Sequence, residues 1–328
     1  MSHFSVFFFE TFSEESLKLK KYIKNEYETH YTEKTIQEWL LDVANTKYIH
    51  MCPATIISIR TQSIIPKTWN TSNNFKAVLS RSTGYDHMIG KIYGRIPGYL
   101  PTYCSSSVAE HATTLWMTLL KKLPQQIKQW DTFNRNNLTC REFGSGNIKM
   151  LVVGVGNIGY KVATIAQSLN IQVLGVDIVK KYNNITYLDN IYQQINNVDI
   201  IICCMNLTDS NINYFNYKLL SQVKKGTIFI NVSRGELSNC IDLHTLLKEG
   251  ILGGVGMDVY PNENILGDKL RNNNTTFSDE EKTILEMSKL SNVIFTPHNA
   301  FNTIEGLENK VKETTKQIIH FWKHNNFL

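Results

Sequence analysis

Short apolar runs alternate with longer polar stretches along the first hundred residues of the chain. The runs lie at residues 6–9, 55–59 and 77–80, and the stretches between them are long enough for helices. Apolar runs of this length, separated by helix-compatible segments, are typical of buried parallel strands. We therefore predict a small parallel α/β unit in this part of the chain.

A second and longer series of apolar runs begins at residue 149. The predicted strands, with one helix at 160–169 after a glycine turn, are residues 149–153, 172–176, 199–204, 227–232, 253–257 and 292–296. Nearly continuous apolar strands that alternate with helices are typical of a parallel sheet covered on both faces. The whole pattern predicts an α/β fold with two Rossmann-like domains, each built on a doubly wound parallel sheet.

Residues 94–101 carry two prolines and two glycines, which favour a hinge. Three serines at 105–107 then cap a predicted long helix over residues 108–123. Near the other end, one amphipathic stripe should face a core, formed by Ile304, Leu307, Val311, Ile318 and Trp322. We expect this last helix to return to the first domain. The substrate domain would then be discontinuous, at residues 1–101 plus 299–328, and the cofactor domain would span residues 102–298.

Composition narrows the classes of function. The chain has 328 residues, 42% of them hydrophobic, and 34 basic against 29 acidic side chains give a net charge of +5. The lysines come as scattered pairs, so no nucleic-acid partner is expected. The first apolar run is too short for a signal sequence or a membrane span. Six cysteines without zinc spacing predict no metal and fit a cytoplasmic protein with reduced thiols. The Asn-rich residues 262–279 are interpreted as a surface excursion.

A glycine turn follows the strand at residues 149–153. It reads Gly154-Val-Gly-Asn-Ile-Gly159 and opens a helix, which is the context in which this motif binds a dinucleotide. Gly154 allows a tight turn, Gly156 allows backbone to approach a pyrophosphate, and Gly159 lets the helix pack on the strand.

Asp177 ends the next predicted strand. A carboxylate at this place accepts hydrogen bonds from the adenosine ribose of NAD and repels the 2'-phosphate of NADP. We therefore predict NAD as the cofactor. The neighbouring Lys180 and Lys181 leave some use of NADP open.

Three polar stretches come directly after predicted strands, where parallel α/β sheets place their ligands. Reduction of a keto acid needs a proton donor at the carbonyl oxygen and a cation for the carboxylate. His298 is the predicted general acid and base, because imidazole titrates near neutrality. Glu263 beside it would favour the imidazolium. Arg234 would bind the substrate carboxylate through its planar fork of donors.

Each of these three residues also has a plain structural interpretation. Arg234 could form a surface ion pair, Glu263 could be a solvated loop acid, and His298 could be a satisfied histidine after a proline turn. Their order behind a dinucleotide motif, each at the exit of a strand, favours catalysis. We expect an oxidoreductase that moves a hydride between NAD and a small 2-hydroxy or 2-keto acid.

At these positions the sequence resembles the D-isomer-specific 2-hydroxyacid dehydrogenase family, in its D-lactate dehydrogenase and vancomycin-resistance dehydrogenase branch. The resemblance runs nearly end to end. It is carried by the glycine turn, by residues 81–87 (RSTGYDH), Tyr103 with 107–111 (SVAEH), 231–235 (NVSRG), 256–260 (GMDVY) with Glu263, and 296–298 (TPH).

The resemblance implies a catalytic triad of Arg234, Glu263 and His298 that reduces a small, pyruvate-like 2-keto acid to the D-2-hydroxy acid. It also implies roles for residues outside the triad: the backbone of Thr83 and Gly84 receives the substrate carboxylate, Tyr103 lines the substrate pocket, and Asp258 contacts the nicotinamide carboxamide. The expected cofactor contacts are Gly154, Gly156, Asn157, Ile158, Gly159, Asp177, Ser233 and Asp258. A packed hinge aromatic is an equal alternative for Tyr103. Similar enzymes are homodimers joined through their cofactor domains, and the same assembly is implied here.

The sequence departs from the family pattern at residues 204–206 (CMN), where a His-Val-Pro-like run is usual. This change alters one wall of the cofactor pocket. Two other functions stay open: a dehydrogenase for another hydroxy acid such as phosphoglycerate, and a non-enzymatic, NAD(H)-sensing protein like the corepressors that keep this fold. An end at Leu328 without a regulatory domain weakens the phosphoglycerate alternative.

Overall fold

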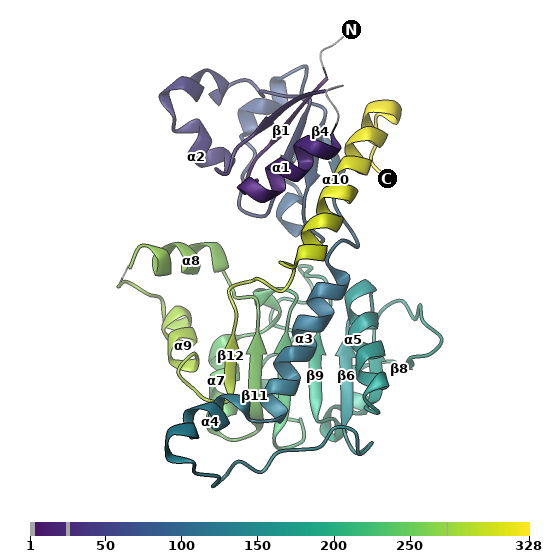
Figure 1. Cartoon of the computed structure of the whole chain (residues 1–328), viewed down its shortest axis with the longest axis vertical. Helices are drawn as coiled ribbons and strands as arrows, with labels where there is room; N and C mark the ends of the chain where they lie inside the picture. Colours follow the sequence, from purple (N-terminus) through teal and green to yellow (C-terminus); the bar gives the residue numbers. More distant parts are fainter. Residues whose placement is uncertain (1–3, 24–26, 274) are drawn as a thin grey trace. The chain divides into compact units, whose positions relative to one another are not determined.

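The chain forms two compact units in a computed structural model that describes residues 4–23, 27–273 and 275–328 (Figure 1). Unit 1 comprises Met1–Cys104 together with Asn302–Leu328, and unit 2 comprises Ser105–Phe301. Unit 1 is therefore built from both ends of the chain.

Unit 1 contains, within its described residues, a five-stranded parallel sheet of order β2-β1-β3-β4-β5. The strands are β1 Ser5–Phe8, β2 Glu28–Tyr31, β3 Ile56–Ile59, β4 Ala77–Ser80 and β5 Ile96–Gly98. The three predicted strands of this unit are confirmed, because β1, β3 and β4 are buried at every position. The order 2-1-3-4-5 is one of the two common arrangements of doubly wound sheets.

The predicted hinge at residues 94–101 proved in part to be a strand. β5 lies inside it, at the edge of the sheet beside β4. An edge strand tolerates Pro97 because its N–H side need not pair. The prolines and glycines that suggested a hinge therefore mark a short edge strand and its flanking turns.

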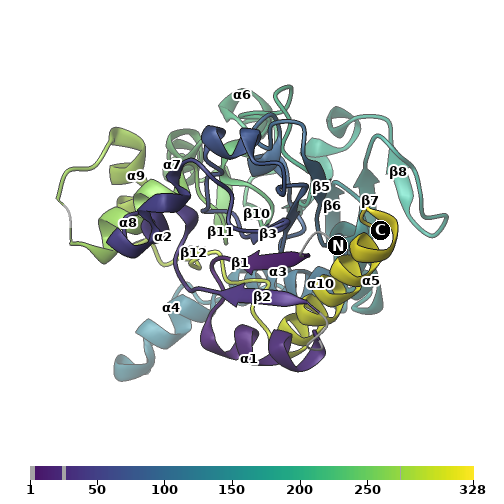
Figure 2. The same cartoon turned by 90° about the horizontal axis from the view of Figure 1, so that it is seen from above.

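Helices α1 Ser13–Tyr22 and α10 Ile304–His324 lie side by side in unit 1, as Figures 1 and 2 show, and α2 spans Ile36–Leu40. The stripe predicted on α10 was partly wrong. Val311 and Ile318 are fully buried, whereas Ile304 and Trp322 are 79% and 49% exposed. Polar side chains occupy much of the buried face instead, and the longest of them, Lys310, pairs with a buried carboxylate described below.

Unit 2 contains, in the part of the chain described, a seven-stranded parallel sheet of order β12-β11-β10-β9-β6-β7-β8. The strands are β6 Lys149–Val153, β7 Gln172–Val176, β8 Thr186–Leu188, β9 Ile200–Cys203, β10 Thr227–Asn231, β11 Leu252–Met257 and β12 Val293–Phe295. Numbered from β6, the order is 3-2-1-4-5-6-7. The first six strands have the Rossmann order, whose switch point lies between β6 and β9.

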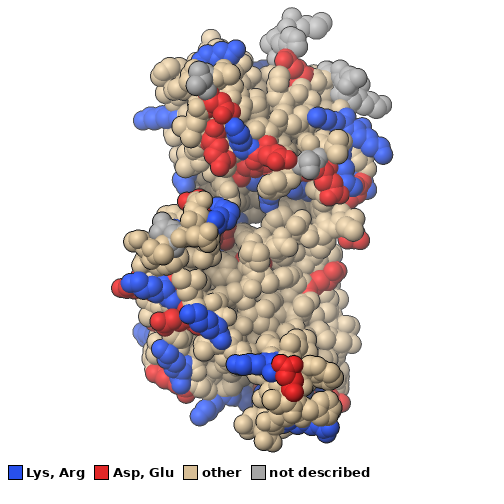
Figure 3. Space-filling view, turned by 60° about the vertical axis from the view of Figure 1, so that its left-hand side comes forward, with Lys and Arg blue, Asp and Glu red and all other residues tan. Residues whose placement is uncertain are grey.

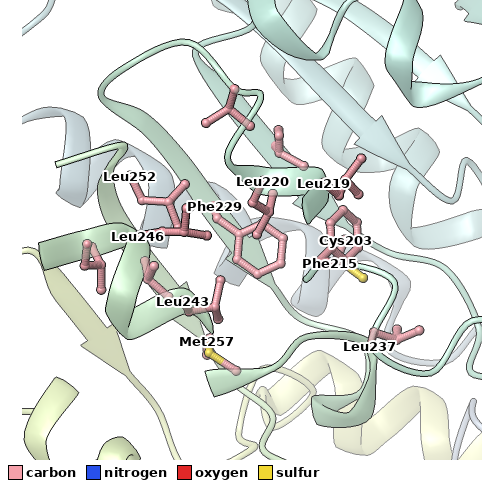
Figure 4. Packing of buried hydrophobic residues seen from close by; sticks show 14 of the residues in the cluster. Cys203, Phe215, Leu219, Leu220, Phe229, Leu237, Leu243, Leu246, Leu252 and Met257 are labelled. Carbon is pink, nitrogen blue, oxygen red and sulfur yellow. The ribbon is translucent and has the colours of Figure 1, made fainter. Parts of the chain in front are cut away.

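Helices cover both faces of this sheet, as predicted. They are α3 Ser105–Leu120, α4 Leu123–Lys128, α5 Asn157–Ser168, α6 Tyr217–Leu220, α7 Cys240–Lys248, α8 Glu263–Arg271 and α9 Asp279–Met287. α3 packs against α5 and against β10 and β11. On the opposite face, alternate strand residues such as Phe229 and Met257 join Leu243 and Leu246 of α7 in one core (Figure 4). Burial of this apolar area stabilises the unit that carries the predicted cofactor turn.

The polar segment at residues 262–279 is not a simple excursion, because α8 occupies its first half. Leu266 buries against the core, and the Lys269 ammonium pairs with the Glu281 carboxylate at 2.7 Å. One apolar anchor and an ion pair to α9 thus hold a helix that the asparagines on both sides of it concealed in the sequence.

The surface mixes charges of both signs. On the face drawn in Figure 3, lysine and arginine side chains are interspersed with aspartate and glutamate. Among the helices described, none combines the length and the apolar character that a membrane crossing requires.

Candidate active site

The glycine turn lies at the carboxyl end of β6, next to the switch point of the unit 2 sheet. Gly154 has a φ of +90°, and a Cβ there would lie 2.4 Å from the backbone nitrogen of Met205. At Gly159 a Cβ would lie 1.9 Å from the carbonyl oxygen of Gly154. Only glycine fits these two positions, which brings the start of α5 against the strand.

Gly156 differs from the other two glycines, because nothing lies within 4 Å of the position of a Cβ there. It is the N-cap of α5 and has no side-chain cap. Open space before an uncapped helix N-terminus fits a dinucleotide pyrophosphate, which the first N–H groups of α5, at Asn157 and Ile158, would hold. The residues present therefore fit NAD.

The Asp177 carboxylate lies beside this turn at the end of β7. One oxygen accepts a hydrogen bond from the Val155 N–H at 2.5 Å, and the other accepts one from the Val179 N–H at 2.9 Å. The carboxylate is thereby fixed at the place where the adenosine ribose is expected. Lys180, which left NADP open, pairs with Asp189 at 2.7 Å.

The segment that departs from the family pattern forms the opposite side of the turn. The backbone of Cys204 and Met205 packs against Gly154, and the Ser233 hydroxyl donates to the Met205 carbonyl oxygen. Burial raises the pKa of the Cys204 thiol to about 12. This thiol is thus protonated at neutral pH.

His298 and Glu263 come together, although 35 residues separate them. The His298 Nδ1 and the Glu263 Oε1 are 2.6 Å apart, and both side chains are about one-third exposed. Glu263 is the first residue of α8, and His298 follows β12 with a φ of +49°. The left-handed backbone at His298 is uncommon for a residue with a side chain and points to a functional constraint.

A buried carboxylate holds the backbone after His298. The Asp258 oxygens accept hydrogen bonds from the N–H groups of Asn299 and Ala300, both at 2.9 Å, and from the Thr296 hydroxyl at 2.6 Å. Asp258 is only 1% exposed. In this structure it therefore fixes the loop that carries His298, a task that the sequence did not reveal.

Two further side chains tie the ends of β11 and β12 together. The Tyr260 hydroxyl lies 2.9 Å from the Thr296 carbonyl oxygen, to which it donates, and burial raises the pKa of this phenol. The Nε2 of His111, on α3, is 3.0 Å from the Thr296 hydroxyl. Both residues belong to motifs that carried the family resemblance, which was the only signal for them.

Arg234 lies on the loop after β10. The Asn231 side chain, fully buried, donates to the Arg234 carbonyl oxygen at 2.9 Å and accepts from the Ser233 N–H at 3.1 Å. A Cβ on the next residue, Gly235, would lie 1.9 Å from the carbonyl carbon of Tyr260. The backbone beside Arg234 therefore touches the segment that leads to Glu263, and Glu263 in turn contacts His298, so unit 2 connects the three predicted catalytic loops.

The remaining predicted site residues lie in unit 1. Thr83 and Gly84 form the loop after β4, and the Thr83 hydroxyl is 3.3 Å from the Cys104 thiol. Tyr103 is 6% exposed, and burial raises its pKa well above the ordinary value. It is thus a neutral, buried phenol, one residue before the first segment of unit 1 ends at Cys104.

A buried cation, Arg81, lies between the end of β4 and this loop. Arg81 is fully buried, and its guanidinium donates at 2.6–3.1 Å to the Glu15 carboxylate, the Ser58 hydroxyl and the carbonyl oxygens of Phe9 and Glu10. The Lys310 ammonium reaches the second Glu15 oxygen at 2.9 Å. Burial alone would raise the pKa of Glu15, but the charges of Arg81 and Lys310 hold it below its ordinary value.

Comparison with known proteins agrees with this geometry. The D-isomer specific 2-hydroxyacid dehydrogenase, NAD binding domain, matches residues 113–300. A D-lactate dehydrogenase of Streptococcus agalactiae is 29% identical over 249 residues, which cover 72% of this chain and 73% of that protein. The crystal structure of D-lactate dehydrogenase from Aquifex aeolicus, complexed with NAD and lactic acid, has a TM-score of 0.85 at 25% identity and 98% coverage of both chains.

D-2-hydroxyisocaproate dehydrogenase, at 20% identity, shares the fold with a TM-score of 0.83 and 98% coverage of both chains. The family match spans more than half of the chain and includes the glycine turn, Arg234, Glu263 and His298. The chain therefore belongs to the D-isomer specific 2-hydroxyacid dehydrogenase family, and it is an NAD-dependent oxidoreductase that acts on 2-hydroxy acids.

Proposed function

We propose that this dehydrogenase reduces a small, pyruvate-like 2-keto acid to the D-2-hydroxy acid, with Arg234, Glu263 and His298 as its catalytic residues. The observation that carries the proposal is the 2.6 Å contact between the His298 Nδ1 and the Glu263 carboxylate. Relatives named D-lactate dehydrogenase support the choice of pyruvate. They also favour an enzyme over an NAD(H) sensor.

The contact determines which imidazole nitrogen works on the substrate. A carboxylate only accepts hydrogen bonds, so the His298 Nδ1 carries a hydrogen toward Glu263. The proton exchanged with the substrate oxygen is then held at Nε2. When bound, NADH supplies the hydride to the keto carbon. Glu263 stabilises the imidazolium that the reduction consumes.

Binding of the substrate carboxylate is assigned to two kinds of donor. Arg234 offers a planar guanidinium, and the loop of unit 1 offers the backbone N–H groups of Thr83 and Gly84. Among the described residues, neither of these two N–H groups donates to a protein acceptor. Two adjacent N–H groups left for a ligand are suited to an anion. Tyr103 is proposed to line the pocket for the substrate side chain.

A panel of keto acids tests this proposal. NADH absorbance is followed with pyruvate, phenylpyruvate, 2-ketoisocaproate, glyoxylate and hydroxypyruvate, each also with NADPH. We expect the highest kcat/KM for pyruvate with NADH, and D-lactate as the product by chiral analysis. A higher kcat/KM for a bulkier acid would refute the choice of pyruvate, and no turnover at all would favour the sensor.

We also propose that the protein is a homodimer joined through unit 2. α4, the short helix Trp130–Thr132 after it and the C-cap of that helix carry four large apolar side chains that are 44–70% exposed: Leu123, Ile127, Trp130 and Phe133. α4 follows the end of α3 and lies outside the sheet (Figure 1). An apolar surface of this kind on a folded unit favours burial against a second copy.

Trp130→Lys with Ile127→Lys tests the dimer. Analytical ultracentrifugation should give twice the chain mass for the wild type and a monomer for the double variant. Leu41→Lys is the control, because Leu41 is 82% exposed in unit 1. A monomeric wild type would contradict the proposed assembly.

A further inference from the structure

A line of side chains leads to the carboxylate-binding loop of unit 1. The Nε2 of His87 lies 3.0 Å from the Ser80 hydroxyl, which lies 2.6 Å from the Ser82 hydroxyl. The Ser82 hydroxyl is 2.7 Å from the carbonyl oxygen of Gly84. Two serine side chains therefore connect His87 to the backbone of the loop.

The last contact sets the direction of the whole line. A carbonyl oxygen only accepts, so the Ser82 hydroxyl donates to Gly84. With its own hydrogen used there, the Ser82 oxygen accepts from Ser80, and the Ser80 oxygen in turn accepts from His87. His87 must therefore carry a hydrogen on Nε2, which both the imidazolium and one neutral tautomer provide. Aligned donors of this kind strengthen one another.

The first two residues of the line, His87 and Ser80, are anchored in packed structure. Ser80 is the last residue of β4 and is fully buried. His87 lies in the short helix Asp86–Met88, and the next residue, Met88, is 3% exposed within the hydrophobic core of the unit. The hydrogen bonds of the line thus hold the loop at residues 82–84 in a fixed position relative to the short helix and to β4.

We infer that His87 is a positioning residue for the substrate carboxylate, acting through Ser80 and Ser82. By holding the Gly84 carbonyl oxygen toward Ser82, the line fixes the turn that presents the N–H groups of Thr83 and Gly84. The inference rests on the proposed function of these two N–H groups. It assigns to His87 no contact with the substrate and no role in the chemical step.

His87→Leu removes the donor at the start of the line. We expect the KM for the preferred keto acid to rise about threefold to tenfold, the effect of weakening one hydrogen bond. The kcat and the KM for NADH should change by less than about twofold, because the loss concerns binding that ground state and transition state share. His87→Gln keeps a side-chain N–H and should restore much of the wild-type KM. His50→Leu makes the same change at an exposed position of unit 1 and should leave every constant unchanged.

Ser82→Ala separates the inference from the proposal on which it rests. This variant breaks the last contact, so its KM should rise at least as much as that of His87→Leu. In the double variant, the His87 change should add nothing, since the line is already cut. If Ser82→Ala raises the KM but His87→Leu does not, or if the two effects simply add, the role of His87 is refuted and the loop keeps its proposed function. If both variants are active and neither changes the KM, the loop does not bind the carboxylate. The proposed role of the loop and the role of His87 are then both refuted.

Discussion

The two units differ in the kind of group that is proposed to act on the substrate: side chains in unit 2 and backbone N–H groups in unit 1. In unit 2 the proposed reacting groups are side chains, with the His298 imidazole paired to the Glu263 carboxylate at 2.6 Å. In unit 1 the proposed groups are the backbone N–H groups of Thr83 and Gly84, which bind the substrate carboxylate, and the Ser80 and Ser82 hydroxyls hold the backbone of their loop. Side-chain chemistry is visible in a motif, whereas backbone chemistry depends on buried partners elsewhere in the sequence.

Both units nevertheless support their sites in the same way. Asp258, buried at the end of β11, accepts three hydrogen bonds from the segment around His298. Arg81, buried at the end of β4, donates to Glu15, Ser58 and two backbone carbonyls. A buried charge with satisfied partners is costly to lose, so it fixes a loop in one conformation.

The largest effect should come from the side chain that transfers the proton. His298→Ala is expected to lower kcat about 10²- to 10⁴-fold, the usual contribution of a general acid and base. NADH binding, measured by fluorescence titration, should stay close to that of the wild type. His324→Ala, at an exposed site on α10, is the control. Equal losses of turnover and NADH affinity would mean that the histidine is structural.

Asp258→Asn tests whether the support in unit 2 matters as much as the reacting group. The amide nitrogen cannot accept the N–H bonds that a carboxylate oxygen takes, so the loop after His298 should loosen. We expect kcat to fall about 10- to 100-fold, as for the loss of charge-assisted hydrogen bonds, with a lower Tm. A raised Kd for NADH with an unchanged Tm would instead favour the nicotinamide contact that the family resemblance implied.

The sequence predicted unit 2 well because the residues of its site lie in short motifs that directly follow recognisable strands. The glycine turn, Asp177 and the three strand exits follow apolar runs whose periods are clear, and β6, β7 and β10 begin where predicted. Unit 1 was harder. Its strands β2 and β5 are short edge strands, and β2 has no buried position. The contacts of Arg81 with Glu15 and of Glu15 with Lys310 span 66 and 295 residues of sequence, so no local period could reveal them.

Asp177→Ala examines the cofactor side of unit 2, where the structure gives the carboxylate two backbone donors. Removal of the charge should lower the preference for NADH over NADPH about tenfold, since a ribose acceptor is lost and the repulsion of a 2'-phosphate is relieved. The ratio of kcat/KM for the two cofactors measures it. Lys180→Met in the same background should reverse part of the gain with NADPH if that lysine attracts the phosphate. An unchanged ratio in Asp177→Ala would refute the ribose assignment.

The smallest effect on turnover is expected at the far side of the unit 1 network, in Lys310→Met. Arg81 stays paired with Glu15 in this variant, so kcat and KM at pH 7 should change by less than about twofold. Stability should respond to pH. Burial lowers the pKa of Lys310 from 10.5 to about 8, Glu15 opposes the shift, and Arg60 and Arg81 add to it.

The sign follows from proton binding. Between about pH 8 and 10.5 the unfolded chain binds the Lys310 proton and the folded chain does not, so the wild type gains stability relative to Lys310→Met as the pH rises through this window. The gain is at most about 3 kcal/mol. Below pH 8 both states bind the proton, and the difference between the two proteins should be constant. Urea unfolding from pH 7 to 10, followed by tryptophan fluorescence, measures it. Parallel stability curves would mean that both states bind the Lys310 proton over the whole range, so that the pKa of Lys310 is not lowered in the folded chain.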